Sequence, residues 1–269
     1  MTNGMITLSA PDLGIASLLV VILAGLTWRQ GVSRSLLIAA LRMVVQLLLI
    51  GLVLNTLFAL ATWYWVALMA VIMLLFAGRE VMARQKRRFR GLWGMSIGAL
   101  SLMLSTFAIT VLTLLLVIRA EPWYEPQYAI PLLGMILGNS MNAVALAVNS
   151  ITTGAWQQRN QIEARLMLGQ SAEQAISQLR AESLHTGLIP IINAMAASGI
   201  VSLPGMMTGQ ILAGSPPIEA VKYQILIMFL IAGTCGFSGL AAVWLGTRRL
   251  FDERQRLRLD RLEVMEHLR

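Results

Sequence analysis

The chain has 269 residues, of which 57% are hydrophobic and only 13% are charged, and its mean hydropathy is +0.71. Because a water-soluble domain carries roughly twice that charged fraction, a single soluble core is excluded. The net charge is +8, and the basic residues lie in short clusters between apolar runs, which favours a membrane protein over a nucleic-acid-binding one.

Seven apolar runs predict the fold class, which is all-α, a polytopic bundle of transmembrane helices. A helix that crosses a membrane needs about 20 mostly apolar residues. Runs of this kind lie in chain order at residues 10–28, 35–57, 62–78, 95–118, 128–151, 188–213 and 221–245. Residues 1–8 contain no Lys or Arg, so a cleavable signal peptide is not expected and the first run should remain as a helix.

Basic residues gather in alternate connections between these runs. Arginine-rich segments follow the first, third, fifth and seventh runs, whereas residues 55–61, 120–127 and 214–220 contain no Lys or Arg. The positive-inside rule therefore predicts an outer N-terminus and a cytoplasmic C-terminus. We expect a permease domain over residues 1–247 with a cytoplasmic loop at 152–187. The charged tail at 248–269 is expected to continue the last helix into water.

Two polar side chains interrupt the second run at membrane depth. Arg42 and Gln46 are four residues apart and share one face of a helix. An arginine at such depth costs roughly 2.5–3.5 kcal/mol on insertion scales, so it should face protein or water. Either these residues line a translocation pathway, or Arg42 is a packing residue that reaches toward the inner surface.

The fifth run carries an asparagine stripe. Gly138, Asn142 and Asn149 fall within a narrow arc of a helix, and Asn139 lies beside it. Amide side chains at membrane depth need hydrogen-bond partners. The stripe predicts a polar pathway lining, with interhelical hydrogen bonding as the alternative. Gly134 and Gly138 are spaced for close helix approach and are candidate hinges.

The sixth run contains a break signal. Pro204-Gly205 is typical of a turn, and irregular backbone at membrane depth requires protein or a water-filled cavity around it. We take this pair as a hinge. Further candidate pathway residues in this run are Asn193, Met206, Met207 and Gln210, although methionine is more often apolar filler than a metal ligand.

The loop at 152–187 predicts two short helices at the cytoplasmic surface. The first covers residues 157–168 and is ended by Gly169. Ser171-Ala-Glu-Gln174 is typical of a capping box that starts the second. An amphipathic element lying on the membrane without any partner is the alternative interpretation.

Residues in this loop resemble a known coupling motif. Glu163-Ala164-Arg165 followed by Gly169 resembles the Glu-Ala-Ala-x-x-x-Gly motif of ATP-binding cassette importer permeases, with Arg165 in place of the second alanine. In those proteins the motif docks into a groove of the ATPase subunit. The resemblance implies an ATPase contact at Glu163, Ala164, Arg165, Gly169 and Ser171.

A longer resemblance covers most of the chain. The segments at 134–142, 163–169, 201–210 and 220–224 occur in an order and composition that resemble the FetB family of iron-export permeases. The resemblance implies a bacterial inner-membrane subunit that pairs with a separate FetA-like ATPase, exports iron and supports resistance to oxidative stress. It also implies a homodimer in a complex with two ATPases. Plant relatives are linked to aluminium tolerance, so the metal is less defined than the family.

The sequence itself requires a partner if ATP is the energy source. A phosphate-binding loop needs Gly-Lys followed by Ser or Thr, and neither Lys86 nor Lys222 follows a glycine. This chain is therefore expected to be no enzyme and to bind no cofactor, with ATP–Mg in the partner subunit. A stand-alone secondary transporter or channel, or a membrane scaffold, remains the alternative, and no metal site is defined.

Overall fold

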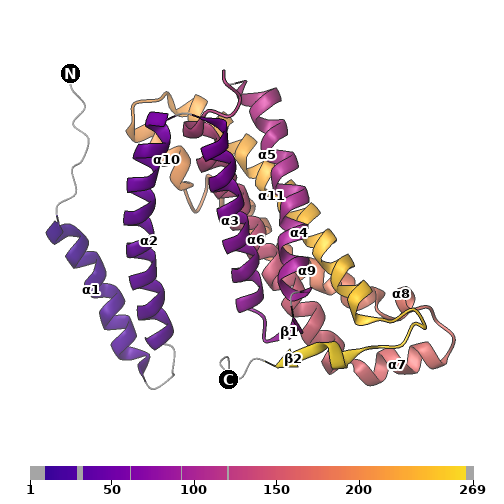
Figure 1. The fold of residues 1–269 in the computed structure, drawn as a ribbon. Helices are drawn as coiled ribbons and strands as arrows, with labels where there is room; N and C mark the ends of the chain where they lie inside the picture. The colour runs from indigo at the N-terminus through magenta and orange to yellow at the C-terminus, as the bar shows by residue number, and fades with distance from the viewer. Residues whose placement is uncertain (1–9, 29–32, 61, 92, 120, 265–269) are drawn as a thin grey trace. The chain divides into compact units, whose positions relative to one another are not determined.

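The computed structural model describes residues 10–28, 33–60, 62–91, 93–119 and 121–264. The expectations for residues 1–8 and for the end of the tail lie outside these ranges. Most of the described chain is helical (Figure 1). It divides into two units, residues 1–62 and 63–269. The first unit holds α1 (Ala10–Leu26) and α2 (Ser33–Leu60), which pack against each other.

The second unit contains the remaining helices and two short strands. Two π-helical segments, η2 and η3, flank a short α5. In chain order the elements are α3 (Trp63–Ala83), β1 (Arg87–Phe89), α4 (Trp93–Leu102), η2 (Met103–Phe107), α5 (Ala108–Thr113), η3 (Leu114–Ile118), α6 (Pro126–Gln157), α7 (Arg159–Met167), α8 (Ala172–Ala175), α9 (Ser177–Ala197), α10 (Gly205–Leu212), α11 (Pro217–Leu250), the 3-10 turn η4 (Leu259–Arg261) and β2 (Leu262–Val264).

The prediction of an all-α polytopic membrane protein is confirmed. Five described helical stretches are long and apolar enough to cross a membrane: Ser33–Phe58, Trp63–Ala83, Trp93–Ile118, Pro126–Gln157 and Pro217–Leu250. α1 is apolar but has 17 residues, and the predicted sixth run is divided between α9 and α10. The count of seven spans and the orientation of the termini stay predictions.

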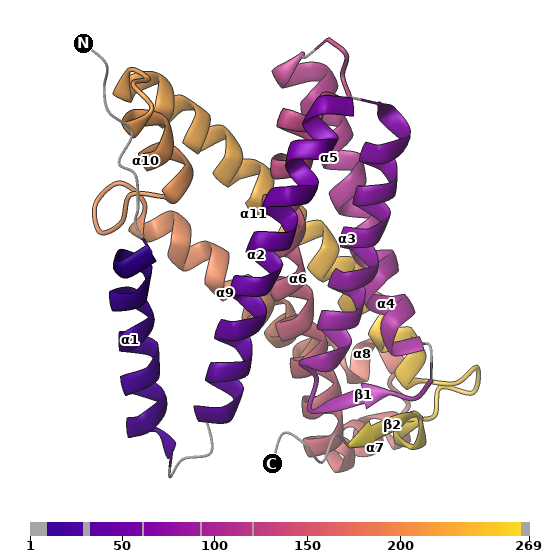
Figure 2. The ribbon, with the colours of Figure 1, turned by 60° about the vertical axis from the view of Figure 1, so that its left-hand side comes forward.

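Helix α6 lies at the centre of the second unit and packs against α11, α9 and α3 (Figure 2). Its residues Ile136, Val144 and Ile151 have no exposed surface. The α6–α9 contact is close because Gly187 of α9 has no side chain. A methyl group at this position would lie 2.7 Å from the carbonyl oxygen of Ala143 and 2.9 Å from Cβ of Ala147. Gly154 of α6 makes similar room for Leu179 of α9.

The predicted loop at 152–187 contains the short helices α7 and α8, and its two ends belong to the long helices α6 and α9. α6 continues to Gln157 and is about 48 Å long at 1.5 Å per residue, well beyond the roughly 30 Å of a bilayer core. α9 begins at Ser177 and runs without interruption to Ala197. The ends of α6 and α9 contact each other through Gly154 and Leu179, so tertiary contacts stabilise helix where the polar sequence predicts a loop.

The expectation of a helical tail is also wrong. α11 ends at Leu250, and β2 pairs antiparallel with β1, with Phe89 opposite Leu262. Phe251 and Leu262 are buried in the core, and Leu257 and Leu259 pack against it. Burying these apolar residues stabilises a folded-back tail more than a solvated helix would.

A tight turn at 252–256 reverses the tail. The Asp252 carboxylate accepts hydrogen bonds from the backbone N–H groups of Arg256 (2.9 Å) and Arg254 (3.0 Å). The Arg256 N–H and the neighbouring guanidinium hold the pKa of the Asp252 carboxyl below its ordinary value, so the turn keeps this charged acceptor at neutral pH.

Replacing Gly187 by alanine should destabilise the protein. The added methyl group would meet the α6 backbone, and overpacking of this kind costs about 1–3 kcal/mol. Thermal unfolding in detergent should show a lower midpoint than for the wild type. The control is Gly236→Ala in α11, where no atom lies within 4 Å of the new methyl group and the midpoint should not fall. Equal stability of the two variants would contradict this account.

Candidate functional site

The predicted coupling segment forms an elbow between α7 and α8. Gly169 has a φ of +85°, a conformation that glycine adopts without strain, and the chain reverses there. Ser171 then caps α8 as predicted. Its hydroxyl accepts from the Gln174 N–H at 3.3 Å, and the Gln174 side-chain oxygen accepts from the Ser171 N–H at 3.0 Å. The capping box is therefore confirmed, although α9 follows after one residue.

Two contacts that the sequence did not reveal hold the elbow in place. The Arg165 guanidinium donates to the Ala175 carbonyl at 3.1 Å, which ties α7 to the end of α8. The Gln255 side-chain oxygen, from the turn of the tail, accepts from the Ala172 N–H at 2.9 Å. Arg165 thus has a structural role at the position where the resembling motif has alanine.

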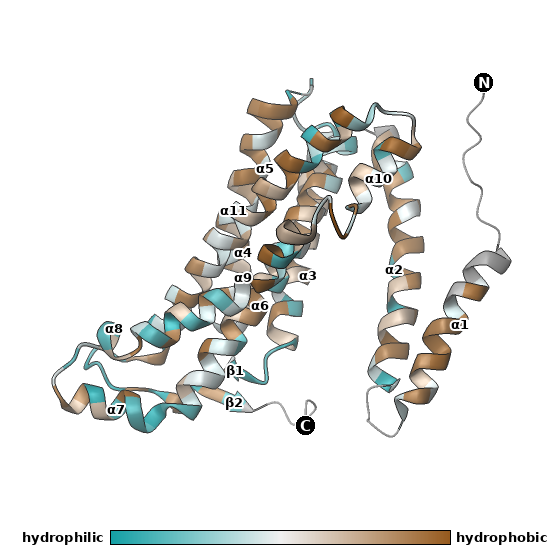
Figure 3. Cartoon of the chain, turned by 180° about the vertical axis from the view of Figure 1, so that it is seen from behind, coloured by the Kyte–Doolittle hydropathy of each residue, from teal (hydrophilic) through white to brown (hydrophobic). Residues whose placement is uncertain are grey.

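The tip of the elbow exposes apolar side chains at the hydrophilic end of the unit. Met167 is 82% exposed and Leu168 is 84% exposed, and Glu163 and Ala164 are exposed on the same helix. Figure 3 shows hydrophilic residues gathered on α7, α8 and β2, whereas α5 is mainly hydrophobic. Exposed apolar residues within a polar surface are typical of a protein–protein contact.

The asparagine stripe divides into two kinds of residue. Asn142 accepts from the Arg84 guanidinium at 2.7 Å, and Asn149 accepts from the Lys86 backbone N–H at 2.9 Å. Both amides thereby fix the chain that leaves α3 for β1. The structure favours the interhelical interpretation for this pair, which sequence reasoning could not find because the partners lie 58 and 63 residues away.

Asn139 is different because it has no partner on another helix among the described residues. Its Nδ2 donates to the Met135 carbonyl one turn earlier, and the side chain is exposed. Its neighbour Gly138 has open space around it, so the close approach expected there does not occur within the second unit. Gly134 contacts only the end of Met73, and α6 is continuous through both glycines. Their hinge role stays a prediction.

The break in the sixth run begins earlier than predicted. α9 ends at Ala197, residues 198–204 are non-helical, and Pro204-Gly205 starts α10 instead of ending a helix. The loop bonds to itself, because the Gly199 N–H donates to the Ser202 carbonyl and the Ser202 N–H donates to the Ala197 carbonyl. This pairing lets irregular backbone exist in an apolar environment.

The loop at the break exposes apolar side chains. α10 has eight residues and rises about 12 Å between the break and the turn that leads to α11. Ile200 is 91% exposed and Val201 is 82% exposed. Such an apolar loop can rest against lipid or another protein.

The other candidate pathway residues are spread over several surfaces. Met207 is buried, Met206 packs against the core beside it, and Asn193 is exposed on α9. The Gln210 side-chain oxygen is buried with no partner in the structure. Arg42 and Gln46 are exposed on α2 within the first unit. Among the described residues, no three His, Cys, Asp or Glu side chains lie together as metal ligands would.

Comparisons with known proteins match nearly the whole chain. The sequence profile of the Uncharacterised protein family (UPF0014) covers residues 10–251. A membrane protein of that family from Synechocystis is 39% identical, over 96% of this chain and 99% of its own. The "Probable iron export permease protein FetB" of Escherichia coli is 31% identical over 94% and 96%. "Protein ALUMINUM SENSITIVE 3" of Arabidopsis thaliana is 31% identical over 86% and 83%. No solved structure matches.

The two kinds of asparagine predict different losses of stability on mutation. Asn149→Ala removes the acceptor of the Lys86 N–H and should cost about 0.5–1.5 kcal/mol, the usual net contribution of one hydrogen bond. Asn139→Ala should change stability by less than about 0.5 kcal/mol. Chemical denaturation of both variants in detergent measures the difference. Equal stability of the two variants would count against an anchoring role for Asn149.

Proposed function

This chain belongs to the UPF0014 family and is a relative of E. coli FetB, and on that premise we propose that it is the permease subunit of an ATP-binding cassette exporter. It is a multi-pass bacterial membrane protein. In the proposal it exports iron or a related metal across the inner membrane, and a separate ATPase supplies the energy. The names of its relatives concern iron export and aluminium sensitivity, which support a metal as substrate.

The elbow is the observation that carries the proposal. The exposed side chains of Met167 and Leu168 project from a rigid turn, and apolar side chains presented in this way fit a groove of a partner protein. Arg165 and Gln255 hold the turn rigid, so a force on the tip would be passed to α8 and α9 and not lost in loop motion.

A continuous path leads from the elbow into the membrane. α9 starts two residues after Ala175 and contacts the α6 backbone at Gly187. The same helix ends at the break that starts at Ser198. Movement of the elbow would therefore shift α9 along α6 and change the position of the break, which is how we propose that access to the pathway alternates.

The pathway itself is proposed to run along the open stripe of α6. Asn139 is exposed beside Gly138, and an amide at membrane depth requires water or protein. We propose that a second copy of the chain faces this stripe across a central pathway. Amide oxygens would then contact the cargo, which suits a hard metal ion or its chelate.

Transport by the purified complex tests the function. Vesicles that contain the permease and its ATPase should show metal flux only with ATP, in a panel of iron and other metal ions. Asn139→Leu should reduce the flux, while Gln161→Leu, on the exposed side of α7, should not. Flux without any ATPase would favour the stand-alone transporter, and no flux with any metal would remove the proposed cargo class.

The coupling role of the elbow gives a second prediction. Glu163→Gln combined with Gly169→Ala should lower ATP-dependent flux severalfold, because a left-handed φ costs a non-glycine residue roughly 1–2 kcal/mol and distorts the tip. Gly91→Ala is the matched control, since Gly91 has a φ of +68° in another connection at the same end. A double variant with normal ATPase binding and normal flux would overturn the coupling proposal.

A further inference from the structure

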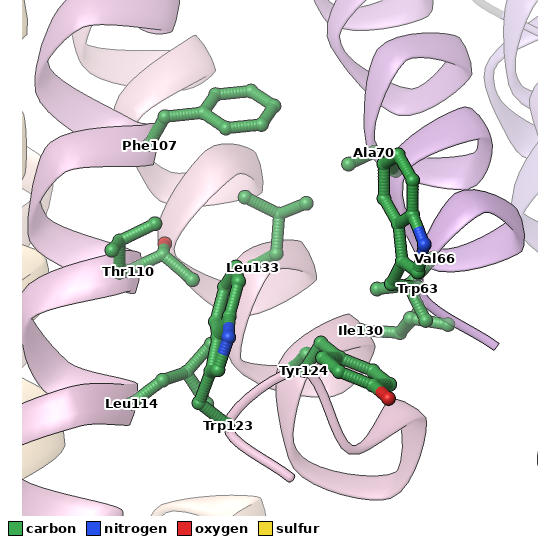
Figure 4. A pocket seen from close by; sticks show the side chains of 13 residues that line it. Trp63, Val66, Ala70, Phe107, Thr110, Leu114, Trp123, Tyr124, Ile130 and Leu133 are labelled. Atoms are coloured by element: carbon green, nitrogen blue, oxygen red, sulfur yellow. The ribbon is translucent and has the colours of Figure 1, made fainter. Parts of the chain in front are cut away.

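The second unit contains an apolar cavity of about 460 Å³ that the transport proposal does not use. It lies between α3, the α5 region and the start of α6, and side chains from these walls point toward one another across it (Figure 4). Val66, Ile130 and Leu133 line its interior, and the hydroxyl residues of the lining are Thr110 and Tyr124. Cavities of this size and character hold apolar ligands.

Aromatic residues place this cavity at one surface of the membrane. Trp63, Trp123 and Tyr124 belong to its lining and lie at the ends of the helices that form it. Trp and Tyr concentrate at the boundary between hydrocarbon and headgroups. The cavity therefore extends from the headgroup level of the leaflet opposite β1 and β2 into the hydrocarbon.

The wall formed by α5 is built from distorted helix. π-helical segments flank α5 on both sides, and Phe107 and Leu114 of those segments line the cavity. The Thr110 hydroxyl is buried and has no partner in the structure, whereas Thr113 makes the usual bond to the carbonyl four residues earlier. π-helical turns are frequent where a helix shapes a binding site.

A positively charged side chain, that of Arg119, lies where the chain leaves this wall. Arg119 ends η3 with its N–H bonded to the carbonyl of Leu114, and its Nε donates to Leu116. No carboxylate lies within ion-pair distance of Arg119 in the described part of the chain. Lys222, at the same end of the bundle, is paired with Glu219 at 2.8 Å. Arg119 is thus available to an anionic group at the membrane surface.

We propose that this cavity binds one acyl chain of a phospholipid whose phosphate contacts Arg119. The apolar walls match a hydrocarbon chain, the aromatic residues match the glycerol and ester level, and the guanidinium complements the phosphate charge. Binding of a lipid in this cavity does not depend on the direction or the cargo of transport, so the lipid site can be tested separately from the proposed function.

A photoactivatable phosphatidylglycerol with a diazirine in the acyl chain tests the site. After illumination of the full-length protein in vesicles, mass spectrometry should find label on the lining segments around Val66 and Thr110. Val111→Trp, which fills the cavity, should lower this labelling about tenfold, equal to roughly 1.4 kcal/mol of lost binding. Leu115→Trp is the control, because Leu115 lies one turn away on the exposed surface.

The headgroup contact has its own pair of variants. Arg119→Gln should lower labelling by the phosphatidylglycerol probe, because the phosphate loses its cation, and Lys222→Gln should leave the labelling unchanged. Labelling of wild-type lining residues no stronger than that of Leu115 would overturn the proposal even if a variant fails to fold. A second test uses a Cys235→Ser background in which Ala67→Cys is paired with a cysteine introduced into α2. A disulfide between these two cysteines, together with an unlabelled lining, would also overturn the proposal, because α2 of the chain itself would then cover the cavity.

Discussion

The close contact between α9 and α6 is the constraint on which the arrangement of the second unit depends. The absence of a side chain at Gly187 lets the two backbones approach each other. About two turns earlier in α9, Leu179 packs against Gly154 of α6. Any side chain at Gly187 would push α9 away from the centre of the bundle. Because α9 also carries the elbow at one end and the break at the other, this single contact sets the position of both.

The end of the unit that carries the elbow is held together by polar contacts between segments that are distant in sequence. Asn142 and Asn149 fix the chain after α3, and that chain pairs as β1 with the tail strand β2. The same tail reaches the elbow through Gln255. Stacking of Arg87 on Trp156, 4.0 Å from the ring centre, adds to this network. Basic residues of this part of the chain thus stabilise this end of the unit.

The opposite half of the unit contains two irregular regions. Several N–H groups of the loop at 198–204 bond to the end of α9 or to the loop itself, and the π-helical segments around α5 leave a cavity that only an apolar group would fill without cost. Thr110 shows the consequence of such distortion, since its hydroxyl loses the bond that a regular helix provides. Structural irregularity in this half is concentrated in two places, the break and the cavity.

The sequence by itself determined the membrane class, the apolar runs, the family and the capping box at Ser171, because composition, hydropathy and cap chemistry act locally. Only the tertiary structure decided where helices end in water. The extension of α6 to Gln157, the start of α9 at Ser177 and the folded-back tail all depend on contacts between residues far apart in the chain. The same holds for the asparagines. Local spacing placed Asn142 and Asn149 on one face, but the partners that give them a structural role come from the connection between α3 and β1. A hydrogen bond across 58 residues leaves no local signal.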